Sequence, residues 1–198
     1  MDYMKISMEE AHKWLKNNLS EKRYLHSLGT AESAKELAKK FGLDEEKAYT
    51  AGLLHDCAKC FSDEKLLEII DSYLDDVDED ERANKKTLHA PASYYIAKTV
   101  FGVKDAEMLS SIRWHTLGKI SMTDFEKIIF LADKIEPRTR SEEYRSKITK
   151  DLESENGLNK SILACYKETI KSLVDRDLKI CPLTVEIYNI MEKSINVN

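Results

Sequence analysis

A histidine and an aspartate, His55 and Asp56, stand side by side directly after an apolar run that ends at Leu54. Both groups are costly to bury, so their position needs a reason. Imidazole nitrogen and carboxylate oxygen are ordinary ligands of divalent transition metals, and the pair could bind one ion or contact two. The structural alternative is a helix end in which Asp56 hydrogen-bonds the backbone and His55 is a satisfied core residue. For an isolated pair this alternative is the more frequent one.

Four further residues with the same chemistry fall at or beside expected helix ends: His26, His89, His115 and Asp133. A dinuclear metal site would explain all six positions together. In such a site His26, His55, Asp56 and Asp133 hold one ion, while Asp56 bridges to a second ion held by His89 and His115. The alternative is a mixture of unrelated surface and core histidines. His12, the fifth histidine, has no such context and is expected at the surface.

These residues must be positioned by helices, because apolar residues recur at spacings of three and four and we find no convincing strand. We expect one all-α domain over residues 1–198 with about eight helices, and no repeat or linker. The expected helical segments are 7–17, 20–41, 44–55, 62–74, 87–101, 105–117, 123–134, 158–177 and 182–194. The segment 123–134 is almost wholly apolar and should be central, with Asp133 at its buried end. The helices in 158–194 should close the bundle, and the acidic run 75–81 should be a solvated loop.

The composition excludes several classes of protein. The net charge of -5 argues against a general nucleic-acid surface, although a local cationic site could still bind a small anionic substrate. The chain has no apolar run of membrane-spanning length, and residues 1–18 lack a signal-peptide pattern. Four cysteines without a second close pair favour reduced thiols over a zinc or disulfide motif. We therefore expect a cytoplasmic protein, with a homodimer left open.

Five motifs make the pattern specific. They are Arg23-Tyr-Leu-His26-Ser-Leu-Gly29, Ala51-Gly-Leu-Leu-His55-Asp56-Cys-Ala-Lys59, Leu88-His89-Ala-Pro91, Arg113-Trp-His115-Thr-Leu-Gly118 and Ala132-Asp133-Lys-Ile-Glu136-Pro137-Arg138. In this order they resemble the HD-domain metal-dependent phosphohydrolases, and more narrowly the YqeK family, over residues 23–140. The chain departs from the family pattern at Ala90, Leu117 and Cys181, and none of these changes removes a ligand.

The resemblance implies an all-α HD fold and symmetrical hydrolysis of diadenosine tetraphosphate to two ADP. It also implies two divalent transition-metal ions, usually iron, with manganese or cobalt as other options. The family is often described as involved in NAD metabolism, which says nothing about the chemistry. Ligand order alone does not select the substrate. An HD-type nucleotidase acting on nucleoside monophosphates or cyclic dinucleotides, and a non-catalytic nucleotide-sensing or RNA-associated module, therefore remain as alternatives.

Hydrolysis of a polyphosphate needs charge neutralisation and a good nucleophile, and two metals supply both. Besides Asp56, we expect Lys59 and Arg138 to take part in catalysis by contacting phosphate and stabilising developing charge. Arg23 and Thr116 are further expected substrate contacts, and Arg23 could instead orient Asp56 or Asp133. Each of these cations could also be a solvated surface charge. Glu136 is expected only to cap or pair locally.

Overall fold

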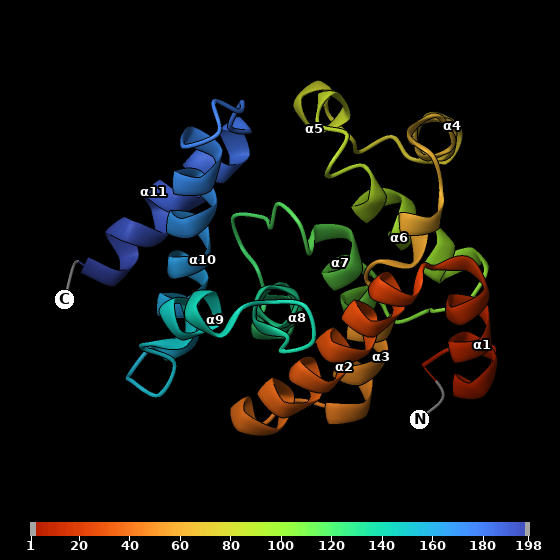
Figure 1. Ribbon diagram of the computed structural model, residues 1–198, viewed down its shortest axis with the longest axis horizontal. Helices are drawn as coiled ribbons and strands as arrows, with labels where there is room; N and C mark the ends of the chain where they lie inside the picture. Colours follow the sequence, from red (N-terminus) through yellow and green to blue (C-terminus); the bar gives the residue numbers. More distant parts are fainter. Residues whose placement is uncertain (1–2, 197–198) are drawn as a thin grey trace.

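The computed structural model describes residues 3–196, and these residues fold into helices joined by short connections (Figure 1). The α-helices are α1 (Met8–Asn18), α2 (Glu21–Phe41), α3 (Glu45–Leu54), α4 (Asp63–Tyr73), α5 (Glu79–Ala83), α6 (His89–Thr99), α7 (Ala106–Trp114), α8 (Asp124–Ile135), α9 (Glu142–Thr149), α10 (Gly157–Val174) and α11 (Pro182–Asn196). A short 3-10 helix, η1 (Cys57–Cys60), follows α3. The expected all-α class is confirmed.

The helix starts that the sequence predicts are set by side-chain caps. Ser7 and Glu10 form a capping box at α1, and Thr123 forms a second one with Glu126 at α8. Gly42 ends α2 in the left-handed conformation, where a residue without a Cβ carries no steric penalty. Because these signals are local, the sequence alone places the ends of the helices well.

The number of helices was underestimated, since eleven α-helices lie within residues 3–196 rather than about eight. One unexpected helix, α5, lies in and just beyond the acidic run that we expected to be a solvated loop. Its Glu81 is only 3% exposed because the buried Arg113 donates two hydrogen bonds to its carboxylate. The other, α9, is polar and buries only Ile148. Neither segment has an apolar stripe, so periodicity could not detect it.

Helix α8 is central, as its apolar sequence predicts. It packs against α2, α3, α7, α9 and α10, and it buries Phe125, Ile128, Ile129, Phe130, Leu131 and Ala132. Helices α2 and α3 also lie close together, because Gly52 brings α3 against the backbone of α2 at Ala31. The ends of α3 and α8 are thereby held next to α2, which positions the residues of the site.

Helices α10 and α11 form a layer on one side of the bundle, across from the region of α5 (Figure 1). Phe130 of α8 and Tyr166 of α10 stack with ring centroids 5.4 Å apart, which fixes this layer to the central helix. No helix within residues 3–196 has the length and hydropathy that a membrane crossing requires. The four cysteines are free thiols, as expected.

Candidate metal centre

Six polar side chains from six elements meet in the interior of the bundle. His26 lies in the second turn of α2, His55 caps the end of α3, and Asp56 begins η1. The other three are His89 at the start of α6, His115 at the end of α7 and Asp133 near the end of α8. All six are buried. The structure therefore brings together every residue that the sequence proposed as a ligand.

The first group of side chains surrounds His26. Its Nε2 atom lies 2.9 Å from Oδ1 of Asp133 and 3.3 Å from Nε2 of His55. Oδ2 of Asp56 lies 3.8 Å from the same nitrogen. Two ligands of one ion at about 2.1 Å each are separated by roughly 3.0–3.4 Å at octahedral or tetrahedral angles. The separations of 2.9 and 3.3 Å are close to this range, and 3.8 Å corresponds to a wider angle between two ligands, so the group suits one divalent ion.

The second group surrounds the other oxygen of Asp56. Nε2 of His89 lies 3.0 Å from Oδ1 of Asp56, and Nε2 of His115 lies 3.4 Å from it. The two histidine nitrogens are 3.1 Å apart. Asp56 is the residue common to both groups, because one oxygen faces His26 and the other faces His89 and His115. This geometry suits a carboxylate that bridges two ions.

The outer nitrogens of the imidazoles show which atoms face the centre. Nδ1 of His55 lies 2.6 Å from the carbonyl of Gly52, and Nδ1 of His115 lies 2.8 Å from the carbonyl of Ile112. A carbonyl only accepts, so we assign the proton to Nδ1 in both rings and a lone pair to Nε2. His26 is held in the same way by the Glu136 carboxylate. Converging lone pairs are stabilised by a cation between them, which is the arrangement of a metal site.

Asp56 does not hydrogen-bond the backbone at a helix end, which was the structural alternative to metal binding. Its side chain makes no capping hydrogen bond to the start of η1, although it occupies the N-cap position. Burial alone would raise the pKa of Asp56, but His55, His89 and His115 outweigh this effect and the pKa lies well below its usual range. The buried carboxylate is therefore ionised and directed at the histidines rather than at the backbone.

The histidines differ in charge preference. Burial lowers the pKa of His55 to about 4, and it also lowers the pKa values of His89 and His115. Burial opposes protonation of His26 as well, but Asp133, Asp56 and Glu136 reverse the effect and raise its pKa. Three of the four imidazoles thus favour the neutral form that binds metal. His26 would adopt the neutral form only if the charge of its neighbouring carboxylates were neutralised. A divalent ion would provide this neutralisation.

Cations ring the carboxylates of the centre. Nη2 of Arg140 lies 3.1 Å from Oδ1 of Asp133, and Lys134 pairs with the other oxygen of Asp133. Nη1 of Arg23 lies 3.6 Å from Oδ2 of Asp56, with about half of its side chain exposed. Lys59 is half-buried nearby, where burial lowers its pKa and Asp56 opposes the shift. These groups leave the site able to accept a polyanion.

A cavity of about 310 Å³ opens beside His26 and is lined by Ser20, Lys22, Arg23, His26, Thr139 and Arg140. Three of these residues are cationic. The cavity therefore provides a polar, positively charged approach to the first group of ligands.

A sequence comparison decides the family. The HD domain family matches residues 23–138, the range that contains all six side chains of the centre. The chain belongs to the HD domain family. The expected resemblance is thereby confirmed.

Two relatives of this HD-domain chain carry the same name, symmetrical bis(5'-nucleosyl)-tetraphosphatase. The protein from Bacillus subtilis is 34% identical over 189 residues, which cover 93% of this chain and 97% of the relative. The protein from Halalkalibacterium halodurans is 35% identical over 178 residues, covering 88% and 91%. A crystal structure from Clostridium acetobutylicum, titled a predicted HD superfamily hydrolase involved in NAD metabolism, superposes with a TM-score of 0.89 at 36% identity. It covers 96% of this chain and 98% of that one.

Glu136 has a larger role in this HD domain than the local pairing expected from the sequence. Its side chain is fully buried, and its carboxylate accepts hydrogen bonds from Nδ1 of His26 at 3.0 Å and from the backbone nitrogens of Arg138 and Thr139. It therefore orients a proposed ligand from 110 residues away. The only signal in the sequence was its place three residues after Asp133.

Lys134 and Arg140, which contact Asp133, were also not singled out in the sequence. Their positions one and seven residues after Asp133 gave no indication of a shared partner. Arg138, which we expected to contact phosphate, forms a two-pronged ion pair with Glu32, with nitrogen–oxygen distances of 2.8–3.2 Å. Its guanidinium is thus engaged by a carboxylate in this structure.

Two further residues named from the sequence have distinct surroundings. The hydroxyl of Thr116 is buried beside the second group of ligands and has no hydrogen-bond partner among the residues that the structure describes. His12 lies outside the centre, as expected. It is half-buried rather than fully at the surface, because its Nδ1 is 3.0 Å from the Tyr24 hydroxyl.

Proposed function

We propose that this protein is a metal-dependent phosphohydrolase that cleaves diadenosine tetraphosphate symmetrically into two ADP. The observation that carries the proposal is the pair of buried ligand groups that share Asp56. The relatives named symmetrical tetraphosphatases, which align over nearly the whole chain, support the choice of substrate. Neither a nucleotide-sensing module nor a structural protein needs two complete ligand groups.

In this proposal His26, His55, Asp56 and Asp133 hold one divalent ion, and Asp56, His89 and His115 hold the other. Two such ions would neutralise phosphate charge and provide an acidified water as the nucleophile. Iron is the proposed metal because the resemblance to the YqeK family implies it, and manganese or cobalt would also suit a mixed set of imidazoles and carboxylates. The cytoplasm is the proposed location, since four free thiols are typical of a reducing compartment.

The cations of the site are assigned to substrate binding and to orientation. Lys59 and the half-exposed Arg23 are proposed to contact phosphate oxygens and to stabilise charge that develops on them. Arg140 and Lys134 hold the Asp133 carboxylate in place by pairing with it. Arg138 remains a proposed phosphate contact, but it would first have to exchange Glu32 for the substrate.

Symmetrical cleavage requires attack at an inner phosphorus. Water then adds to one of the two central phosphoryl groups, the central bridging bond breaks, and each half leaves as ADP. Attack at an outer phosphorus would give AMP and ATP instead. Cations on both sides of the ligand pair, Lys59 and Arg23 among them, would hold the inner phosphates near the reacting position.

The products test this assignment directly. The protein is incubated with diadenosine tetraphosphate in oxygen-18 water, and the nucleotides are separated by chromatography. We expect ADP alone, with one labelled oxygen for each molecule of substrate cleaved. Equal amounts of AMP and ATP would show asymmetrical cleavage instead. Turnover of nucleoside monophosphates only would replace the proposal with the nucleotidase alternative.

The metal content tests the ligand assignment. After anaerobic purification, elemental analysis should find two transition-metal ions per chain. Asp56→Ala should lose both ions and reduce kcat at least about a thousandfold, because this residue is common to the two groups. His12→Ala is the matched control, and it should keep both ions. A variant of Asp56 that retains full metal content and activity would contradict the assignment.

A further inference from the structure

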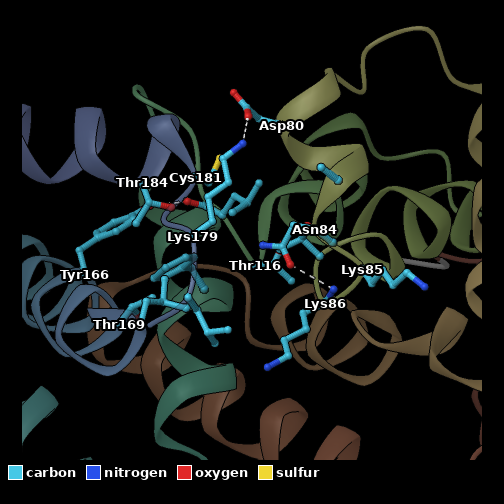
Figure 2. A pocket seen from close by; sticks show the side chains of 16 residues that line it. Asp80, Asn84, Lys85, Lys86, Thr116, Tyr166, Thr169, Lys179, Cys181 and Thr184 are labelled. Carbon is cyan, nitrogen blue, oxygen red and sulfur yellow. Dashed lines mark hydrogen bonds and ion pairs between the residues drawn. The ribbon is translucent and has the colours of Figure 1, made fainter. Parts of the chain in front are cut away.

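A second cavity, of about 450 Å³, lies between the α10–α11 layer and the segment 83–87 (Figure 2). Tyr166 and Thr169 of α10 face Thr116 and Asn84 across it. On one side it is closed by an ion pair of 2.8 Å between Lys179 and Asp80, which joins the connection before α11 to α5. The cavity is therefore a partly open space between two parts of the fold.

Two wall residues of the cavity are close in sequence to the second group of proposed ligands, although no ligand itself lines the cavity. Thr116, in its wall, directly follows His115, and Thr87, also in its wall, lies two residues before His89. Lys134 lies between the metal centre and the cavity. It pairs with Asp133 in the centre, and its Nζ lies 4.7 Å from the ring centroid of Phe130 in the cavity wall. A ligand in the cavity can thus extend a charged chain toward the centre.

The lining fits a flat, mostly apolar group that also carries polar atoms. Apolar surface comes from the rings of Phe130 and Tyr166 and from Leu173 and Leu178. A highly charged phosphate would lose its hydration against such surfaces, whereas a nucleobase and its ribose would not. Asn84 and Thr169 contribute polar side chains to the same lining, which suits the polar atoms of a base or a ribose.

We propose that this cavity binds one nucleoside of the substrate, with its phosphate chain directed toward His89 and His115. This inference rests on the proposed function for the identity of the ligand. The cavity beside His26 has a different chemistry, because cations make up half of its six lining residues, whereas Lys85, Lys86 and Lys179 are three of the sixteen around the larger cavity. One nucleoside of a symmetrical substrate is therefore held in an apolar pocket, while the other half lies along a polar, cationic one.

The test compares the binding of ADP with that of inorganic pyrophosphate, which lacks the nucleoside. Leu178, which is 40% exposed at the cavity wall, is replaced by the larger side chain in Leu178→Trp. Isothermal titration of the purified, metal-containing protein should show an ADP Kd raised by about tenfold, the scale of losing one stacked base. The Kd for pyrophosphate should change by less than about twofold.

Val174→Trp is the matched control, since Val174 is 58% exposed on α10 and is not in the cavity wall. It should leave both dissociation constants unchanged. Ala83→Trp fills the cavity from the opposite wall, at the exposed end of α5, and decides the question if Leu178→Trp does not fold.

The outcomes separate this inference from the proposed function. Unchanged ADP affinity in both folded tryptophan variants would overturn the nucleoside pocket, even if the dinucleotide is still cleaved. Equal losses for ADP and pyrophosphate would also overturn it, because the cavity would then bind phosphate. Selective loss of ADP binding supports the pocket whether or not the native protein cleaves diadenosine tetraphosphate, and the product analysis judges that reaction separately.

Discussion

Glu136→Gln should selectively weaken the metal position that contains His26. One carboxylate oxygen, Oε2, accepts from the backbone nitrogen of Arg138 at 2.7 Å, and the other, Oε1, faces Nδ1 of His26 at 3.0 Å. The backbone N–H of Arg138 can only donate a hydrogen bond. The amide oxygen of a glutamine would therefore remain at Arg138, and its NH₂ group would face His26. To accept from that group, His26 must move its own proton to Nε2. The nitrogen that faces the metal position would then lose its lone pair.

The expected losses of metal affinity and of stability follow from the contacts that change. Loss of an orienting partner of a metal ligand typically costs about 10- to 100-fold in metal affinity, which corresponds to about 1.4–2.8 kcal/mol. The backbone nitrogen and the hydroxyl of Thr139 also donate to the Glu136 oxygen that faces His26. The N–H of Thr139 also reaches Oε2, at 3.2 Å, which remains an oxygen in the variant, so only the hydroxyl loses its acceptor and the metal-free protein would be destabilised by about 1–2 kcal/mol.

Three measurements check the variant. Calorimetric titration with a divalent metal should show one weakened site and one unchanged site, and urea unfolding should show the lower stability. Nitrogen-15 NMR of the metal-free protein should report a proton on Nε2 of His26. Glu142→Gln, which changes an exposed carboxylate on α9, is the control and should behave like the native protein. Native affinity at both sites, with the native His26 tautomer, would refute the reasoning.

Two other predictions concern stability. The free energy of unfolding of the metal-free protein should fall as the pH drops from about 6.5 toward 4. Burial lowers the pKa of His55 from 6.5 to about 4, so the unfolded chain binds a proton that the folded chain does not, and His89 and His115 act in the same direction. Urea unfolding at several pH values checks this, and a flat profile across that range would contradict it. Glu81→Gln should lower the stability by about 1.5–3 kcal/mol, because it removes the buried carboxylate partner of Arg113 and leaves only the exposed carboxylate of Asp76, at 3.3 Å. Its control, Glu79→Gln on the exposed side of α5, should change the stability by less than about 0.5 kcal/mol in the same assay.

Much of the fold could be predicted because its signals are local. Caps such as Ser7 and Thr123 and the apolar run of α8 act within one or two turns, so they can be recognised without knowing what packs against them. Helix α5 escaped detection because its stability depends on Arg113, which lies 32 residues from Glu81 in the sequence. Its acidic residues by themselves indicate a solvated loop.

The sequence by itself determined the six candidate ligands, because histidine and aspartate placed at helix ends suggest metal chemistry wherever those helices lie. Only the tertiary structure decided which atoms of these residues meet, which oxygen of Asp56 faces each group, and which distant residues surround them. Glu136, Lys134 and the apolar cavity belong to this second class. The physical reason is that a pairing charge or a cavity wall is defined by distance in space, and residue type and spacing carry no record of that distance between separate helices.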